Sequence, residues 1–239
     1  MPRLRHPPAT PLPSPPRAPA LGLFLALTLI LILTPAPAAA AGFQVAPAGE
    51  PPAELAPALR EALAAEGTLV RDGEEPVLRV WLRASPAGSG DSGGGGGELG
   101  VAFGSLPEGG LLGVVALERP WVDYREQTVA PGLYTLRYLV EPVDGAHMGV
   151  SYYRDFVLLV PAADDAGPEA AYAEDELVAA SRAAAGTNHP AVMALFPVAA
   201  DGAPTIVDNE MGQPTLALRM PGSEEGDQVG LVVEGTGEM

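Results

Sequence analysis

The fold follows most directly from the stretch PGLYTLRYLV, residues 131–140. Pro131-Gly132 fits the centre of a type II turn, because proline presets φ at the first central position and glycine permits a positive φ at the second. After the turn, side chains alternate with a period of two, which is typical of a β-strand. One face would carry Tyr134, Leu136, Tyr138 and Val140, and the other Leu133, Thr135, Arg137 and Leu139.

A second strand is predicted at residues 153–160, and the segment 142–152 would connect the two strands as a hairpin. The register of this hairpin decides which polar pair forms. In one register Arg137 pairs with Asp155, and in another Tyr138 stacks on Arg154. The connection is longer than the usual two to five residues of a hairpin, and long loops on rigid sheets often carry binding groups.

Strand-like runs separated by turn residues continue on both sides of this hairpin. They are residues 68–71, 77–83, 99–103, 111–118, 192–198, 205–208, 215–219 and 229–233. Two stretches are helical in pattern: residues 54–66, which end before Gly67, and residues 168–185, which end before Gly186. Many short strands and few helices predict a mainly β fold, an antiparallel β-sandwich that is immunoglobulin-like or jelly-roll-like.

The N-terminus has the pattern of a secretory signal peptide over residues 1–41. Arginines precede an apolar run at 21–33 that is too short to span a bilayer, and small residues follow it, so cleavage is expected near Ala40 or Ala41. The exported chain would be periplasmic or extracellular, without a stable membrane anchor. It would begin with an Ala/Pro-rich segment at 42–75, which is irregular over 42–53 and contains a short helix after that. A sandwich domain at 76–239 would follow, with a Gly-rich loop at 85–97.

Composition excludes several classes of chemistry. The chain has no cysteine, and all 13 of its basic residues are arginine, which removes disulfides, thiolate sites, Schiff-base lysines and P-loop lysines. Its formal net charge is −17, and loss of the leader with its three arginines and no acidic residue changes this to −20. Such an acidic excess argues against a nucleic-acid partner.

Two loops contain the candidate binding residues: 142–152, and 186–190 after the second helix. We interpret the protein as an exported, non-catalytic binder that uses these loops for an unidentified ligand or partner. The candidate ligand-binding residues are Asp144, His147, Arg154, Asp155, Asn188 and His189.

An alternative is a periplasmic metal-binding carrier or a metal-dependent hydrolase. His147 and His189 would meet if both loops lay at the same end of the sheet, with Asp144 as a carboxylate ligand. Two imidazoles and a carboxylate suit zinc, and an imidazole with a thioether suits copper. The histidines are far apart in sequence and match no known metal motif, so two ordinary loop histidines without a cofactor are the simpler expectation.

The segment Gly90-Asp91-Ser92-Gly93-Gly94 matches a serine-protease motif in letters only. A catalytic triad in that order needs a histidine upstream of the serine, and the one upstream histidine, His6, lies in the leader. We therefore assign no catalytic residue.

Five segments together resemble a group of exported bacterial proteins to which no activity is assigned. These are WVDYR (121–125) with PGLYTLRY (131–138), DGAHMG (144–149), RDFVLLVP (154–161) and TNHP (187–190). The resemblance covers about residues 105–195, and it implies export and a β-rich domain.

Overall fold

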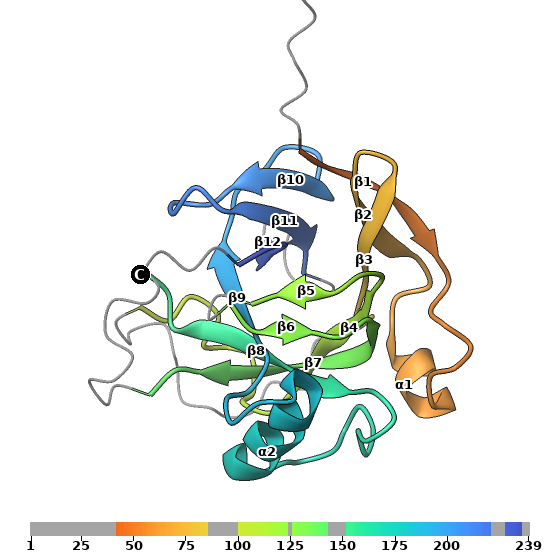
Figure 1. Cartoon of the computed structure of the whole chain (residues 1–239), viewed down its shortest axis with the longest axis vertical. Helices are drawn as coiled ribbons and strands as arrows, with labels where there is room; N and C mark the ends of the chain where they lie inside the picture. The colour runs from red at the N-terminus through yellow and green to blue at the C-terminus, as the bar shows by residue number, and fades with distance from the viewer. Residues whose placement is uncertain (1–41, 86–99, 124–125, 143–151, 221–227, 236–239) are drawn as a thin grey trace, which may run out of the picture. The chain divides into compact units, whose positions relative to one another are not determined.

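A computed structural model describes residues 42–85, 100–123, 126–142, 152–220 and 228–235 (Figure 1). All of them belong to one compact unit, Ala39–Met239. Its strands are β1 (Phe43–Gly49), β2 (Gly67–Asp72), β3 (Glu75–Leu82), β4 (Leu111–Leu117), β5 (Trp121–Val122), β6 (Thr128–Val129), β7 (Gly132–Val140), β8 (Asp155–Pro161), β9 (Val192–Pro197), β10 (Thr205–Asp208), β11 (Pro214–Arg219) and β12 (Gln228–Val232). The helices are α1 (Pro57–Ala62) and α2 (Glu174–Ala185).

Ten strands form one antiparallel sheet in the order β1-β2-β3-β4-β7-β8-β9-β12-β11-β10, and β5 pairs with β6 separately. The two edge strands, β1 and β10, contact each other, so the sheet nearly closes on itself like a barrel (Figure 1). The predicted mainly β, antiparallel fold with two short helices is confirmed. Ten of the strands belong to one hydrogen-bonded sheet, so the two separate sheets of the predicted sandwich are not distinguished by strand pairing.

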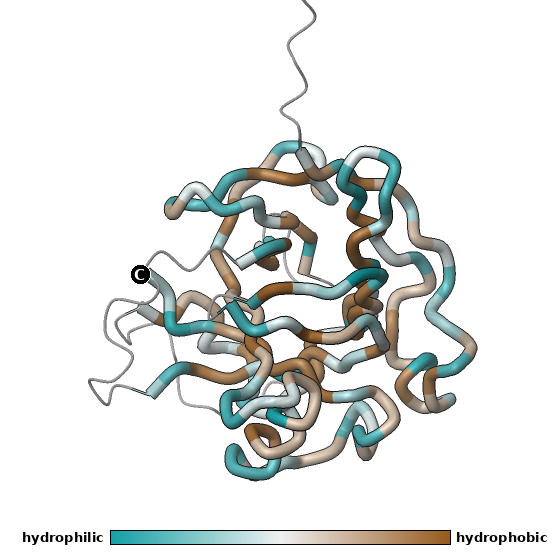
Figure 2. Tube along the Cα trace, in the orientation of Figure 1, coloured by the Kyte–Doolittle hydropathy of each residue, from teal (hydrophilic) through white to brown (hydrophobic). Residues whose placement is uncertain are grey.

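Strand β7 shows why the sheet curls around a core. Its predicted apolar face, which includes Tyr134, Leu136 and Tyr138, packs into the main core with residues of β4, β8, β11 and β12. Figure 2 shows hydrophobic residues along these strands. The opposite face of β7 is also covered, because Leu139 packs with Leu158 of β8 and Leu177 of α2. Burial on both faces makes this strand the centre of the fold.

Four local predictions are wrong. The second helix begins at Glu174 instead of at residue 168. Residues 43–49, expected to be irregular, form β1 and pair antiparallel with β2, since backbone pairing does not require a strong apolar pattern at an edge strand. Residues 100–103, the described part of a predicted strand, form none. Gly67 does not end α1, which stops at Ala62; it begins β2, where a Cβ atom would lie 2.4 Å from Trp81 Nε1. Only glycine allows that close approach.

The sheet changes partners along β9. Val192, Met193 and Ala194 pair with β8, whereas Leu195, Phe196 and Pro197 pair with β12. The first half of β9 is therefore hydrogen-bonded to β8 and the second half to β12. Among the described residues, no helix is long and apolar enough to span a membrane.

Candidate functional site

A pocket of about 270 Å³ lies where β8, β9 and α2 meet the segments after β7 and before β9. Most of its wall is apolar, with side chains from the main core and from the cluster under α2. Its wall includes apolar, aromatic and charged residues: Trp121, Tyr153, Phe156, Phe196, Met193, Met211, Val178, Pro142, Pro190, Glu141, Arg154, Asp155, Glu174, Arg182 and His189. Apolar walls with a few polar groups are typical of small-molecule sites.

Aromatic rings form much of this wall. Tyr153 and Phe196 meet edge to face, with centroids 5.6 Å apart and planes at 80°. This contact joins the end of the segment before β8 to β9, at the point where the two strands have ceased to pair. Trp121 is fixed nearby, because its indole Nε1 donates a 2.6 Å hydrogen bond to the Val233 carbonyl. These contacts fix the positions of the three rings in the wall.

Charged side chains of both signs lie around the apolar wall. Glu174 and Arg182 come from α2 and are exposed, as is His189. Arg154 and Glu141 lie opposite each other at the ends of β8 and β7, where Arg154 Nε donates to the Glu141 carbonyl at 2.6 Å. The wall thus has two acids and two guanidinium groups in addition to Asp155.

Asp155 lines the pocket but is only 1% exposed. Its carboxylate accepts hydrogen bonds from the amides of Ala102 and Phe103, at 2.7 and 3.0 Å, and from the Tyr138 hydroxyl at 2.6 Å. These three bonds tie the segment at residues 100–103 to the end of the β7–β8 hairpin. Of the predicted site residues, Asp155 is therefore one that fixes the wall rather than one that faces a ligand.

The loop 186–190 is held at both ends. Gly186 ends α2 in the left-handed conformation, with φ of 66°, as its position predicted. Gln127 Nε2 donates to the Pro190 carbonyl at 3.1 Å and to Asp123 at 2.7 Å, and the Thr187 hydroxyl donates to Gln127 Oε1. These bonds place His189 and Pro190 at the pocket, whereas Asn188 is exposed and does not line it.

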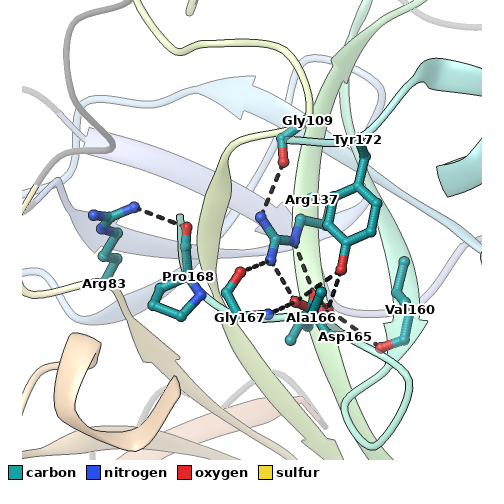
Figure 3. A network of polar contacts seen from close by, with 10 residues as sticks. Arg83, Gly109, Arg137, Val160, Asp165, Ala166, Gly167, Pro168 and Tyr172 are labelled. Atoms are coloured by element: carbon teal, nitrogen blue, oxygen red, sulfur yellow. Dashed lines mark hydrogen bonds and ion pairs between the residues drawn. The ribbon is translucent and has the colours of Figure 1, made fainter. Parts of the chain in front are cut away.

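A second cluster lies on the outer face of β7 (Figure 3). Arg137 and Asp165 are fully buried, and Arg137 Nε and Nη2 donate to the two Asp165 oxygens at 2.9 and 2.5 Å. The Thr135 hydroxyl and the Gly167 amide also donate to this carboxylate. The Tyr172 ring lies 4.9 Å from the Arg137 guanidinium carbon, and its hydroxyl donates to Asp165 at 3.2 Å.

The electrostatics of this cluster favour the ionised pair. Burial raises the pKa of the Asp165 carboxyl, but hydrogen bonds from Arg137, Thr135 and Gly167 and the charge of Arg137 outweigh it. The pKa of Asp165 is therefore below its ordinary value of 3.8. Burial raises the pKa of the Tyr172 phenol, which favours the neutral form. Arg83 holds the same segment at a second point, through a 3.3 Å bond to the Pro168 carbonyl. The hydrogen bonds of this cluster fasten the segment after β8 to β7 and to Arg83.

The predicted pairing of Arg137 with Asp155 is wrong. The register places Arg137 opposite Leu158, and Asp155 opposite Val140. Arg137 therefore pairs with Asp165 instead of Asp155, and Tyr138 meets Asp155 through a hydrogen bond. The partner of Arg137 comes from the segment after β8, which strand alternation could not place.

Two predicted site residues, Asp144 and His147, lie outside the described residues, as does Ser92. The approach of His147 to His189 accordingly stays a prediction. Within the described part of the chain, no group of three or more His, Asp or Glu side chains is placed to hold a metal ion. The structure brings together Arg154, Asp155 and His189 from the predicted set.

The concentration of aromatic residues between 121 and 156 indicated part of the apolar wall from the sequence, because Trp121, Tyr153 and Phe156 all line the pocket. The β9 part of the wall, which includes Phe196, had no such signal, since it lies far away in the sequence and outside both candidate loops.

No protein-family model matches the chain, and neither a curated protein nor a solved structure matches it. The chemistry of the site is therefore judged from its own residues.

Proposed function

We propose that this protein is an exported, non-catalytic binder that takes a small, mainly apolar ligand into the pocket between α2, β8 and β9. The observation that carries the proposal is the pocket itself, about 270 Å³ in volume and lined by aromatic, aliphatic and thioether side chains. Removing apolar ligand surface from water is the main source of affinity in such a site.

The two candidate loops support this location. Pro142, at the start of the loop 142–152, lines the pocket, and so do His189 and Pro190 of the loop 186–190. Arg154 and His189 then provide polar groups that orient a ligand whose apolar part is buried. The non-catalytic interpretation is supported by Asp155, whose carboxylate is engaged by three internal donors.

The experiment is a titration with Nile red, an uncharged dye whose fluorescence rises in apolar surroundings. Wild-type protein should bind it saturably, and Val178→Arg should abolish binding because a guanidinium would enter the apolar wall. Ala183→Arg is the matched control, since Ala183 is exposed on the same helix and does not line the pocket. Equal binding by both variants would refute the proposed site.

Export is a separate part of the proposal and is supported by the leader-like residues 1–41. Expression in a bacterium with an intact secretion system, followed by mass spectrometry of the extracytoplasmic protein, should give an N-terminus close to Ala41 or Gly42. Full-length protein retained in the cytoplasm would contradict export.

We also propose that the nearly closed sheet is flattened, so that two groups of strands face each other like the layers of the predicted sandwich. The support is a shared core, in which Leu136 and Leu159 pack in the same cluster as Leu216 and Leu231.

A further inference from the structure

We infer that the ligand of this pocket is an uncharged aromatic molecule, in preference to an aliphatic chain or an organic anion. The inference rests on the proposed function and adds the chemical class of the ligand. It depends on three properties of the wall: which side chains form it, how two of them are arranged, and where its charges lie.

The pocket concentrates a residue type that the chain otherwise uses sparingly. Aromatic residues make up 5% of the sequence, yet four of them line this one pocket: Trp121, Tyr153, Phe156 and Phe196. Met193 and Met211 line it as well. Rings favour other rings at offset or perpendicular angles, and thioethers favour ring edges, so this combination selects aromatic partners beyond simple apolar burial.

The arrangement of two rings supports the same ligand class. Tyr153 and Phe196 already form a perpendicular pair, in which the edge of one ring meets the face of the other. Tyr153 is the partly exposed member of this pair, so its ring is the one available for a further stacked or perpendicular ring. Phe196, which is 1% exposed, supports the Tyr153 ring through the perpendicular contact.

Charge then separates neutral aromatic ligands from anions. The buried ionisable group of the wall is Asp155, an acid, and Glu141 and Glu174 add two further carboxylates. The two guanidinium groups of the wall are those of Arg182, which is exposed to water, and Arg154, which is partly exposed and donates to the Glu141 carbonyl, and the whole chain has a net charge of −17. A carboxylate carried into the apolar wall would lose its hydration beside a buried acid.

The test compares three compounds with similar skeletons by calorimetry at pH 7: 1-naphthol, its saturated counterpart decahydro-1-naphthol, and 1-naphthoate. We expect 1-naphthol to bind about threefold or more tightly than the saturated alcohol, from ring–ring contacts. It should bind roughly tenfold more tightly than 1-naphthoate, from the cost of burying the carboxylate.

Two variants locate the preference. Phe196→Leu should reduce the affinity ratio of 1-naphthol to decahydro-1-naphthol towards one, and Phe156→Leu, at a partly exposed position, provides the same test with less effect on folding. Phe103→Leu is the control, because Phe103 packs against the core without lining the pocket. It should leave the ratio unchanged.

The outcomes separate this inference from the proposed function. Equal or tighter binding of the saturated alcohol or of 1-naphthoate overturns the inference while the binding function stands. Failure of all three compounds in a protein that still binds Nile red at the pocket also overturns the inference alone. Loss of Nile red binding as well removes the proposed function.

Discussion

Arg137 on β7 and Asp165 in the segment after β8 form a two-point ion pair with both side chains fully buried. The pair fastens the segment that leads from β8 to α2 against the outer face of β7. Tyr172, just before α2, covers the guanidinium. The ion pair thus fastens the segment that leads into α2, and α2 supplies Glu174, Val178 and Arg182 to the pocket.

Removing one partner of this pair should be strongly destabilising. Asp165→Ala leaves the Arg137 guanidinium buried without its counterion, and we expect a loss of about 3–5 kcal/mol in the free energy of unfolding. The double variant Arg137→Met, Asp165→Leu should recover a large part of that loss, since no buried charge remains. Urea unfolding of both variants measures this, and an equal loss in both would contradict a role for the unpaired charge.

The same carboxylate should make stability depend on pH. The folded pKa of Asp165 lies below 3.8, so its contribution is fully present above the unfolded value and is lost as pH falls through the folded pKa. The difference in unfolding free energy between wild type and Asp165→Asn should therefore be constant from pH 7 to about pH 5 and narrow below about pH 4. A constant difference down to pH 2 would show that Asp165 is not the titrating group.

Period-two alternation was sufficient to predict the central strands. The faces of β7 are as expected because Tyr134, Leu136 and Tyr138 repeat at the strand period, and the stop at Gly186 follows from its left-handed geometry. The partner of Arg137 could not be predicted, because Asp165 lies 28 residues away, in the segment after β8. Long-range pairing of that kind depends on tertiary packing.

The candidate site was predictable only in part. Loop position and charge selected Arg154, Asp155 and His189, and all three line the pocket. Part of its apolar wall comes from β9, which pairs with β8 over one half and with β12 over the other, and the local pattern of Val192–Pro197 does not encode these partners. The role of Asp155 was also hidden, because its donors come from residues 102, 103 and 138.

Asp155 should be a stability determinant of the segment at 100–103. Replacing it with alanine removes the acceptor of the Ala102 and Phe103 amides, and hydrogen bonds to charged groups contribute about 1.5–3 kcal/mol each. Hydrogen exchange at these two amides should accelerate in Asp155→Ala. Asp164→Ala, at an exposed position, is the control and should leave their protection intact. Unchanged exchange in both variants would contradict the assignment.

The metal alternative has a direct test. If His147 and His189 share a zinc or copper ion, purified wild-type protein dialysed against the metal should retain about one ion per chain, and His147→Ala, His189→Ala should retain none. Elemental analysis provides the count. The same metal content in both proteins would end the alternative and leave the apolar binder.

Gln127 should control binding without lining the pocket. It bonds Asp123, Thr187 and Pro190, and so fixes the loop that carries His189. Gln127→Ala removes the side-chain hydrogen bonds to Thr187 and Pro190, so the loop 186–190 is no longer fixed at the pocket. Each binding event must then order this loop, and the lost conformational entropy lowers the affinity. We expect the Kd for Nile red to rise by roughly three- to tenfold. Thr128→Ala, on the exposed side of β6, is the matched control. An unchanged Kd for Gln127→Ala would show that this loop does not contribute to the site, and the binding surface would then consist of the strand and helix residues alone.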